Sequence, residues 1–157
     1  VCRSFRSVVI IISCFTVAHS VTLALVTLGA VHLPANLVEP LIAASILFVG
    51  VENLVRRGAE PKGRGAVAFG FGFIHGFGFD NVLRDLGVGA SGSGVAVPLL
   101  GFNLGVELGQ IAVAAIALPL LWQLRRLPAF TRFGVPILSG IVAAIGLYWL
   151  LERTVLG

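Results

Sequence analysis

Charged residues are scarce in this sequence: they make up 11% of its 157 residues, against roughly 25% in a typical soluble domain. Eleven basic and seven acidic side chains cannot cover the water-facing surface of a domain of this size. Hydrophobic residues account for 57% of the chain, a share far too high for a disordered tail. The composition therefore excludes both a soluble enzyme and a disordered segment.

Cysteine and methionine are also nearly or wholly absent. Cys2 and Cys14 are the only cysteines, and they form neither a metal-site spacing nor a disulfide framework. A secreted disulfide scaffold and a thiolate cluster that selects copper(I) are therefore excluded. Methionine does not occur even at position 1, so we expect either an unusual start or a piece of a longer protein.

Long apolar runs fill most of the chain instead, and each is close to the ~20 residues that a helix needs to cross a bilayer. The first is too long for the apolar region of a cleaved signal peptide, and it contains Thr16, His19 and Ser20. We predict an all-α fold, a polytopic transmembrane helix bundle of about five spans that forms one domain over residues 1–157. The expected helices cover residues 7–28, 37–55, 66–86, 95–121 and 133–151.

The basic residues predict the orientation of these spans. They lie in short clusters between the apolar runs, which indicates a lipid bilayer rather than a nucleic acid as the partner. Arg84 and Arg153 fall on one side of the membrane. The other nine fall on the opposite side, and they are Arg3, Arg6, Arg56, Arg57, Lys62, Arg64, Arg125, Arg126 and Arg132. The positive-inside rule then places the N-terminus in the cytoplasm and the C-terminus outside.

Three polar residues occur in the middle of the fourth expected helix. Asn103, Glu107 and Gln110 are spaced by four and three residues, so all three share one helix face near the middle of the membrane. A carboxyl group at that depth is protonated, paired with another charge or bound to a cation. The alternative is a neutral Glu107 that only shares hydrogen bonds with the two amides.

The third expected helix contains the glycine-rich run GFGFIHGFGFDN, over residues 70–81. Gly72 and Gly76 form a GxxxG face that allows another helix to approach closely. His75 lies beside this face. Asp80 either marks the end of the helix or contributes to a site.

Polar residues of the first two expected helices are further candidates. His19 lies at the edge of a serine and threonine stripe, where it either bonds to a neighbouring helix or binds a metal or proton. Glu52 and Asn53 lie near the cytoplasmic end of the second helix. Glu52 has Arg56 four residues on, a spacing that also suits a simple interfacial ion pair.

These imidazoles, carboxylates and amides form a donor set of intermediate softness. Imidazole with oxygen donors suits nickel, cobalt, copper or zinc. A site through which an ion passes must also bind it weakly enough to release it. Mixed nitrogen and oxygen ligands on several helices meet both requirements.

Three motifs of the chain resemble the HupE/UreJ family of bacterial membrane proteins. They are FTVAHSVTL (Phe15–Leu23), FIHGFGF (Phe73–Phe79) and FNLGVELGQ (Phe102–Gln110), and the stretch Val38–Leu54 resembles the family as well. The resemblance implies a permease-like protein of the bacterial cytoplasmic membrane that supplies nickel or cobalt to hydrogenase or urease. The metal positions carried over are His19, His75, Asn103, Glu107 and Gln110, with Glu52 and Asn53 as secondary positions.

The sequence departs from the family pattern at its beginning. Members usually have a motif of the form HxxxxxDH on a helix before the FTxAHS segment, and no residue precedes Val1 to supply it. We therefore expect missing N-terminal helices, or a homo-oligomer, to complete the protein.

Three functions remain open from the sequence. The first is transport or facilitated entry of a nickel or cobalt ion for metalloenzyme maturation, with the ion as cargo and no prosthetic group. The second is a membrane accessory or scaffold protein whose buried polar residues only hold helices together. The third, an intramembrane enzyme, has little support, because Ser20 and His19 are neighbours on a helix and do not face each other, and GxSxG does not occur.

Overall fold

The computed structural model of the protein describes residues 4–56, 63–79 and 96–156, and within them it contains helices and no strands. The α-helices are α1 (Phe5–Thr27), α2 (Ala35–Arg56), α3 (Arg64–Phe77), α5 (Ala96–Leu124) and α6 (Val135–Leu151). Two short π-helical segments, η1 (Phe130–Gly134) and η2 (Glu152–Leu156), adjoin the two ends of α6. The predicted all-α helix bundle is confirmed.

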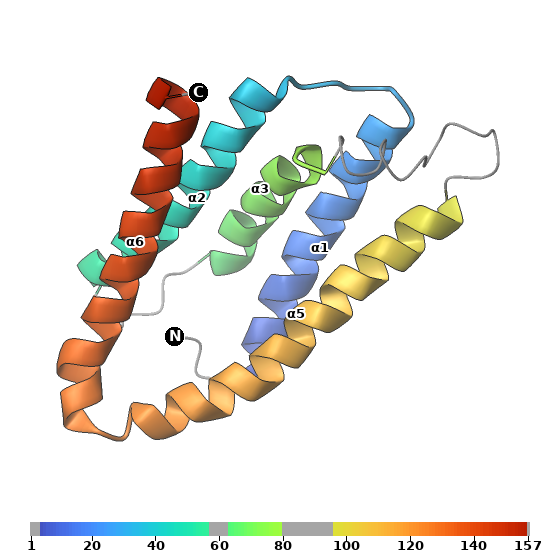
Figure 1. The fold of residues 1–157 in the computed structure, drawn as a ribbon. Helices are drawn as coiled ribbons and strands as arrows, with labels where there is room; N and C mark the ends of the chain where they lie inside the picture. The colour runs from blue at the N-terminus through green and yellow to red at the C-terminus, as the bar shows by residue number, and fades with distance from the viewer. Residues whose placement is uncertain (1–3, 57–62, 80–95, 157) are drawn as a thin grey trace.

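The helices lie side by side in the order α6, α2, α3, α1, α5, as Figure 1 shows. α3 packs between α1 and α2, α5 packs against α1, and α6 packs against α2. Helices that follow one another along the chain run in opposite directions (Figure 1). The contact of α5 with α1 brings together polar residues of two helices that are distant in sequence.

Four helical segments of the described chain are long and apolar enough to cross a membrane: α1, α2, α5 and the continuous helix from Phe130 to Val155. Their outer faces are strongly apolar. On α5, for example, Leu100, Val113 and Ile116 are 70%, 67% and 76% exposed. Such a surface suits lipid rather than water. The expected third span is described only as the 14-residue α3, and the rest of it, from residue 80 onward, lies outside the described residues.

Small residues allow two of the helix pairs to approach closely. Gly72 and Gly76 of α3 are buried against α1. Gly50 of α2 and Gly146 of α6 are buried against each other's helices, and a methyl group on Gly146 would lie 2.5 Å from the backbone nitrogen of Leu47. Close backbone approach of this kind is how membrane helices gain packing energy without a hydrophobic driving force.

The two ends of the bundle differ in charge. The described basic residues Arg6, Arg56, Arg64, Arg125, Arg126 and Arg132 lie on segments that meet at one end, the lower end in Figure 1. At the opposite end, Arg153 forms an ion pair with Glu39, which ties η2 to the first turns of α2. Arg3, Arg57, Lys62 and Arg84 lie outside the described residues.

Candidate functional site

The glycine face of α3 sets the geometry of the site. A methyl group on Gly72 would collide with the backbone oxygen of Phe15, and one on Gly76 would lie 2.6 Å from the Oγ1 of Thr22 and 2.8 Å from the backbone oxygen of His19. α3 can therefore lie this close to α1 only because both residues lack a side chain. This approach brings His75 of α3 next to the α1 segment that contains His19.

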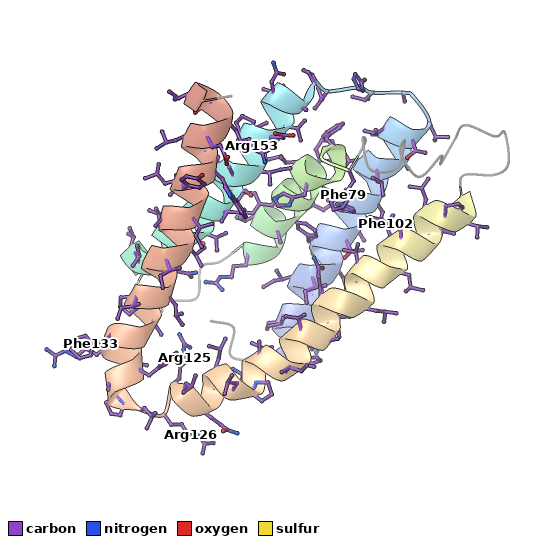
Figure 2. The ribbon with its side chains drawn as sticks, viewed as in Figure 1. Phe79, Phe102, Arg125, Arg126, Phe133 and Arg153 are labelled. Atoms are coloured by element: carbon purple, nitrogen blue, oxygen red, sulfur yellow. The ribbon has the colours of Figure 1, made fainter. Side chains whose placement is uncertain are left out.

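His19 is the most enclosed polar group of the site, with 1% of its surface exposed. Its ring stacks on Phe15 and Phe102, whose ring centroids lie 5.9 and 6.2 Å away. The Phe79 ring is nearly perpendicular to it, with its centroid 5.3 Å away. Figure 2 shows Phe79 and Phe102 close together where α3, α1 and α5 meet. Aromatic rings thus surround the imidazole and exclude most other polar partners.

One hydrogen bond determines which ring nitrogen of neutral His19 carries the hydrogen. Its Nδ1 lies 3.1 Å from the Oδ1 of Asn103, and the Nδ2 of Asn103 donates to the backbone oxygen of Leu99 at 2.9 Å. Because Oδ1 can only accept, Nδ1 of His19 must donate. In the neutral ring Nε2 then has a free lone pair, the state in which histidine binds a metal.

His75 is held in the same way from the other side of α3. Its Nε2 lies 2.9 Å from the Oγ of Ser45 on α2, and Ser45 donates its one hydrogen to the backbone oxygen of Ile42 at 2.7 Å. Ser45 therefore accepts a hydrogen bond from Nε2 of His75. In the neutral ring the free lone pair of His75 is on Nδ1.

Glu107 lies one helical turn from Asn103 on α5. Its Oε1 accepts a hydrogen bond of 2.8 Å from the Oγ of Ser13 on α1. Because α1 and α5 are antiparallel, the Ser13–Glu107 and His19–Asn103 pairs form successive levels of one polar seam, about 9 Å apart along α1. The carboxyl group thus belongs to the same seam as His19 but does not share its hydrogen bond.

A hollow of about 460 Å³ opens beside this seam. Residues of all five α-helices line it, among them His75, Ser45 and Gln110. The Oε1 of Gln110 is buried without a hydrogen-bond partner, and so is the Oγ1 of Thr16. A buried oxygen without a partner costs free energy unless a water molecule or an ion satisfies it.

The five expected metal positions therefore fall into three groups. His19 and Asn103 bond to each other, Glu107 bonds to Ser13, and His75 and Gln110 line the hollow. No group of three or more histidine, cysteine, aspartate or glutamate side chains close enough to hold a metal occurs among the described residues. The five positions therefore do not lie together in one closed cluster within the described residues.

The secondary positions lie elsewhere. Glu52 forms an ion pair of 3.2 Å with Arg56, as the spacing of four residues allows. Glu52 and Asn53 line a smaller hollow of about 240 Å³ together with Arg64, on the side toward the basic end of the bundle. Asp80 lies outside the described residues.

From residue 1 to residue 153, the chain matches the HupE / UreJ protein family. The chain belongs to the HupE/UreJ family. This family comprises transporter and accessory proteins rather than enzymes. Together with the membrane-spanning helices, membership identifies a membrane protein. No curated protein and no solved structure matches the chain.

Some contributors to the site of this HupE/UreJ family member could not be predicted from the sequence. Ser45 is one serine in a long apolar run, and the only signal was that a hydroxyl at membrane depth needs a partner. The aromatic enclosure of His19 was missed because Phe15 comes from α1, Phe102 from α5 and Phe79 from the turn after α3. On α1, Ser20 and Thr27 of the serine and threonine stripe bond to the backbone of their own helix, and Thr22 does the same.

Proposed function

We propose that this protein carries a divalent transition-metal ion, nickel or cobalt, across the bacterial cytoplasmic membrane for metalloenzyme maturation. In this proposal the basic end of the bundle faces the cytoplasm, which gives a cytoplasmic N-terminus and an external C-terminus. The ion is cargo, and it passes the polar groups of α1, α2, α3 and α5.

The observation that carries the proposal is the state of the two histidines. Each has one ring nitrogen occupied by a defined partner, Asn103 for His19 and Ser45 for His75. A metal-binding histidine is typically held in this way, with its second nitrogen donating to an oxygen. The two remaining lone pairs, on Nε2 of His19 and Nδ1 of His75, are nitrogen ligands that suit nickel and cobalt.

Oxygen donors near the histidines add to the support. The unpartnered Oε1 of Gln110, the unpartnered Oγ1 of Thr16 and the carboxyl group of Glu107 are buried or partly buried acceptors. No group of three or more histidine, cysteine, aspartate or glutamate side chains close enough to hold a metal occurs among the described residues, so each position would offer the ion only one or two ligands. Weak binding at several positions is what transport requires, since the ion must leave each of them.

A membrane accessory or scaffold protein is the second candidate, and a specific observation favours it. The hydrogen bonds between two side chains that are described at the site each join two helices. They pair Ser13 with Glu107, His19 with Asn103, and Ser45 with His75. Such bonds stabilise membrane helix bundles without any transport, and each contributes about 0.6 kcal/mol on average. The two functions predict different effects on metal uptake when the charge of Glu107 is removed.

Metal uptake by cells that contain site variants of the full-length protein distinguishes transport from a scaffold function. Glu107→Gln preserves size and still accepts the hydrogen bond from Ser13, but it removes the charge. We expect Glu107→Gln and His75→Ala to abolish nickel or cobalt uptake and His19→Ala to weaken it, with normal membrane insertion. Ser20→Ala is the matched control, because Ser20 bonds only to the backbone of its own helix. Parental uptake by a normally inserted Glu107→Gln variant would favour the scaffold function.

A further inference from the structure

A second large hollow lies at the basic end of the bundle, away from the histidines. It has a volume of about 860 Å³ and lies between the end of α2 and the turn from α5 into η1 and α6. Its lining combines polar with apolar residues: Asn53, Leu54, Arg125, Thr131, Arg132, Val135 and Pro136. Neither the family assignment nor the proposed transport explains why two arginines line it.

Acidic side chains do not neutralise this hollow within the described chain. Among the described residues, ion pairs join Arg56 with Glu52 and Arg153 with Glu39, and neither pair involves Arg125 or Arg132. The Nε of Arg125 is buried and has no hydrogen-bond partner. A buried guanidinium nitrogen without an acceptor costs free energy, so the hollow favours an anion.

The position of the two arginines favours one particular anion. Figure 2 shows Arg125 inside the angle between α5 and α6, whereas Arg126 lies outside it. Arg132 lies with its guanidinium carbon 5.2 Å from the centre of the Phe133 ring, and Phe133 is 57% exposed. Leu54, Val135 and Pro136 continue the lining with apolar surface.

We propose that this hollow binds the headgroup of an anionic phospholipid. The phosphate would lie between Arg125 and Arg132, with the Asn53 amide as a further donor. The acyl chains would then follow the exposed apolar face of α6, where Ile137 and Leu138 are 60% and 48% exposed. Basic pockets between transmembrane helices bind anionic headgroups in this way. A free phosphate ion would satisfy the arginines but not the apolar lining.

Native mass spectrometry of the purified protein tests the proposal. We expect phosphatidylglycerol to remain bound in preference to phosphatidylcholine. Arg125→Gln and Arg132→Gln should each lower that preference about fivefold, since each removes one headgroup contact. Arg126→Gln is the matched control, because it removes the same charge from the neighbouring residue outside the hollow, and it should change nothing. Arg125→Lys keeps the charge and should retain most of the preference even if the glutamine variant folds poorly.

Three results would overturn this proposal. Equal retention of both lipids would show no headgroup preference, and an equal loss in the Arg126→Gln variant would reduce the effect to general surface charge. Displacement of phosphatidylglycerol by added inorganic phosphate would identify a site for a soluble anion. Each result leaves the transport proposal unaffected, because the lipid site shares no residue with the five main metal positions, His19, His75, Asn103, Glu107 and Gln110.

Discussion

Two histidines on adjacent helices each have one ring nitrogen held by a partner whose own hydrogen bonding is already determined. Asn103 must accept from His19 because the atom that faces Nδ1 of His19 is its Oδ1, while its amide nitrogen donates to the oxygen of Leu99. Ser45 must accept from His75 because its hydrogen is donated to Ile42. The partner residues therefore decide which nitrogen of each histidine is available to a metal.

The role of Ser45 can be tested separately from that of His75. Ser45→Ala removes the acceptor for Nε2 of His75, so the ring no longer has a fixed tautomer or orientation. We expect nickel affinity to fall about 10–100-fold, the usual cost of losing such a supporting partner. Equilibrium binding of nickel to the purified protein measures the effect, with Ser20→Ala as the control. Unchanged affinity in Ser45→Ala would show that the hydrogen bond to His75 serves helix packing alone.

At the residue scale the sequence predicted which residue types matter but not how they pair. Glu107 and Asn103 were expected to share one cavity with Gln110, because their spacing places all three on one face of a helix. The partners of that face depend on the register between α1 and α5, which are separated by residues 28–95. That register places Ser13 opposite Glu107 and His19 opposite Asn103, and no local pattern in the sequence determines it.

At the scale of whole helices, glycines determine how closely the elements approach. Gly76 of α3 faces Thr22 and the backbone of His19, whereas a methyl group on Gly70 of the same helix would meet no neighbouring element within 4 Å. The two glycines therefore differ in packing while sharing helix propensity and residue type.

This difference gives a sharp test of the α1–α3 contact. Gly76→Val would force α3 away from α1, and overpacking of this kind typically costs about 1–3 kcal/mol. We expect a clear loss of folded yield and thermal stability for Gly76→Val in detergent and little change for Gly70→Val. Size-exclusion chromatography after heating measures both variants. Equal tolerance of the two substitutions would contradict the close helix contact.

The sequence predicted the apolar segments of the helices better than their contacts. Apolar runs of membrane length require helices, because every backbone group must be satisfied inside the bilayer. The GxxxG pattern of Gly72 and Gly76 also predicted a close approach, although not its partner. The equally close contact between α2 and α6, at Gly50 and Gly146, was missed because the two glycines lie on helices that are distant in sequence and form no recognisable motif.

At the scale of the whole molecule, the alternation of the helices separates two chemically different ends. Ala30 follows α1 at one end, and Ala129 precedes η1 at the other, and both are exposed. After Cys2 and Cys14 are replaced by alanine, single cysteines at these two positions report the topology. We expect a membrane-impermeant thiol reagent added outside intact cells to label Ala30→Cys but not Ala129→Cys. Labelling of both from outside would contradict the alternating five-helix arrangement, and the reverse pattern would contradict the orientation.

The arrangement of the whole molecule also explains why the proposed metal positions do not lie together in one cage. Among the described residues the main helix contacts join neighbours in the row α6, α2, α3, α1, α5, so polar groups of α2 and α5 approach from opposite sides of α1 and α3. In the proposed function, positions distributed in this way would bind an ion weakly and in succession. Protons compete for the same lone pairs, so we expect metal binding to weaken as the pH falls through the histidine range.

In the proposed function, this protein itself moves the metal across the membrane. Proteoliposomes that contain the purified full-length protein and an entrapped nickel-sensitive dye measure this directly. We predict time-dependent nickel entry that His75→Ala abolishes, that His19→Ala weakens and that Ser20→Ala leaves unchanged. Entry no faster than into protein-free liposomes, from a protein that is folded and correctly inserted, would contradict transport and establish the accessory function in its place.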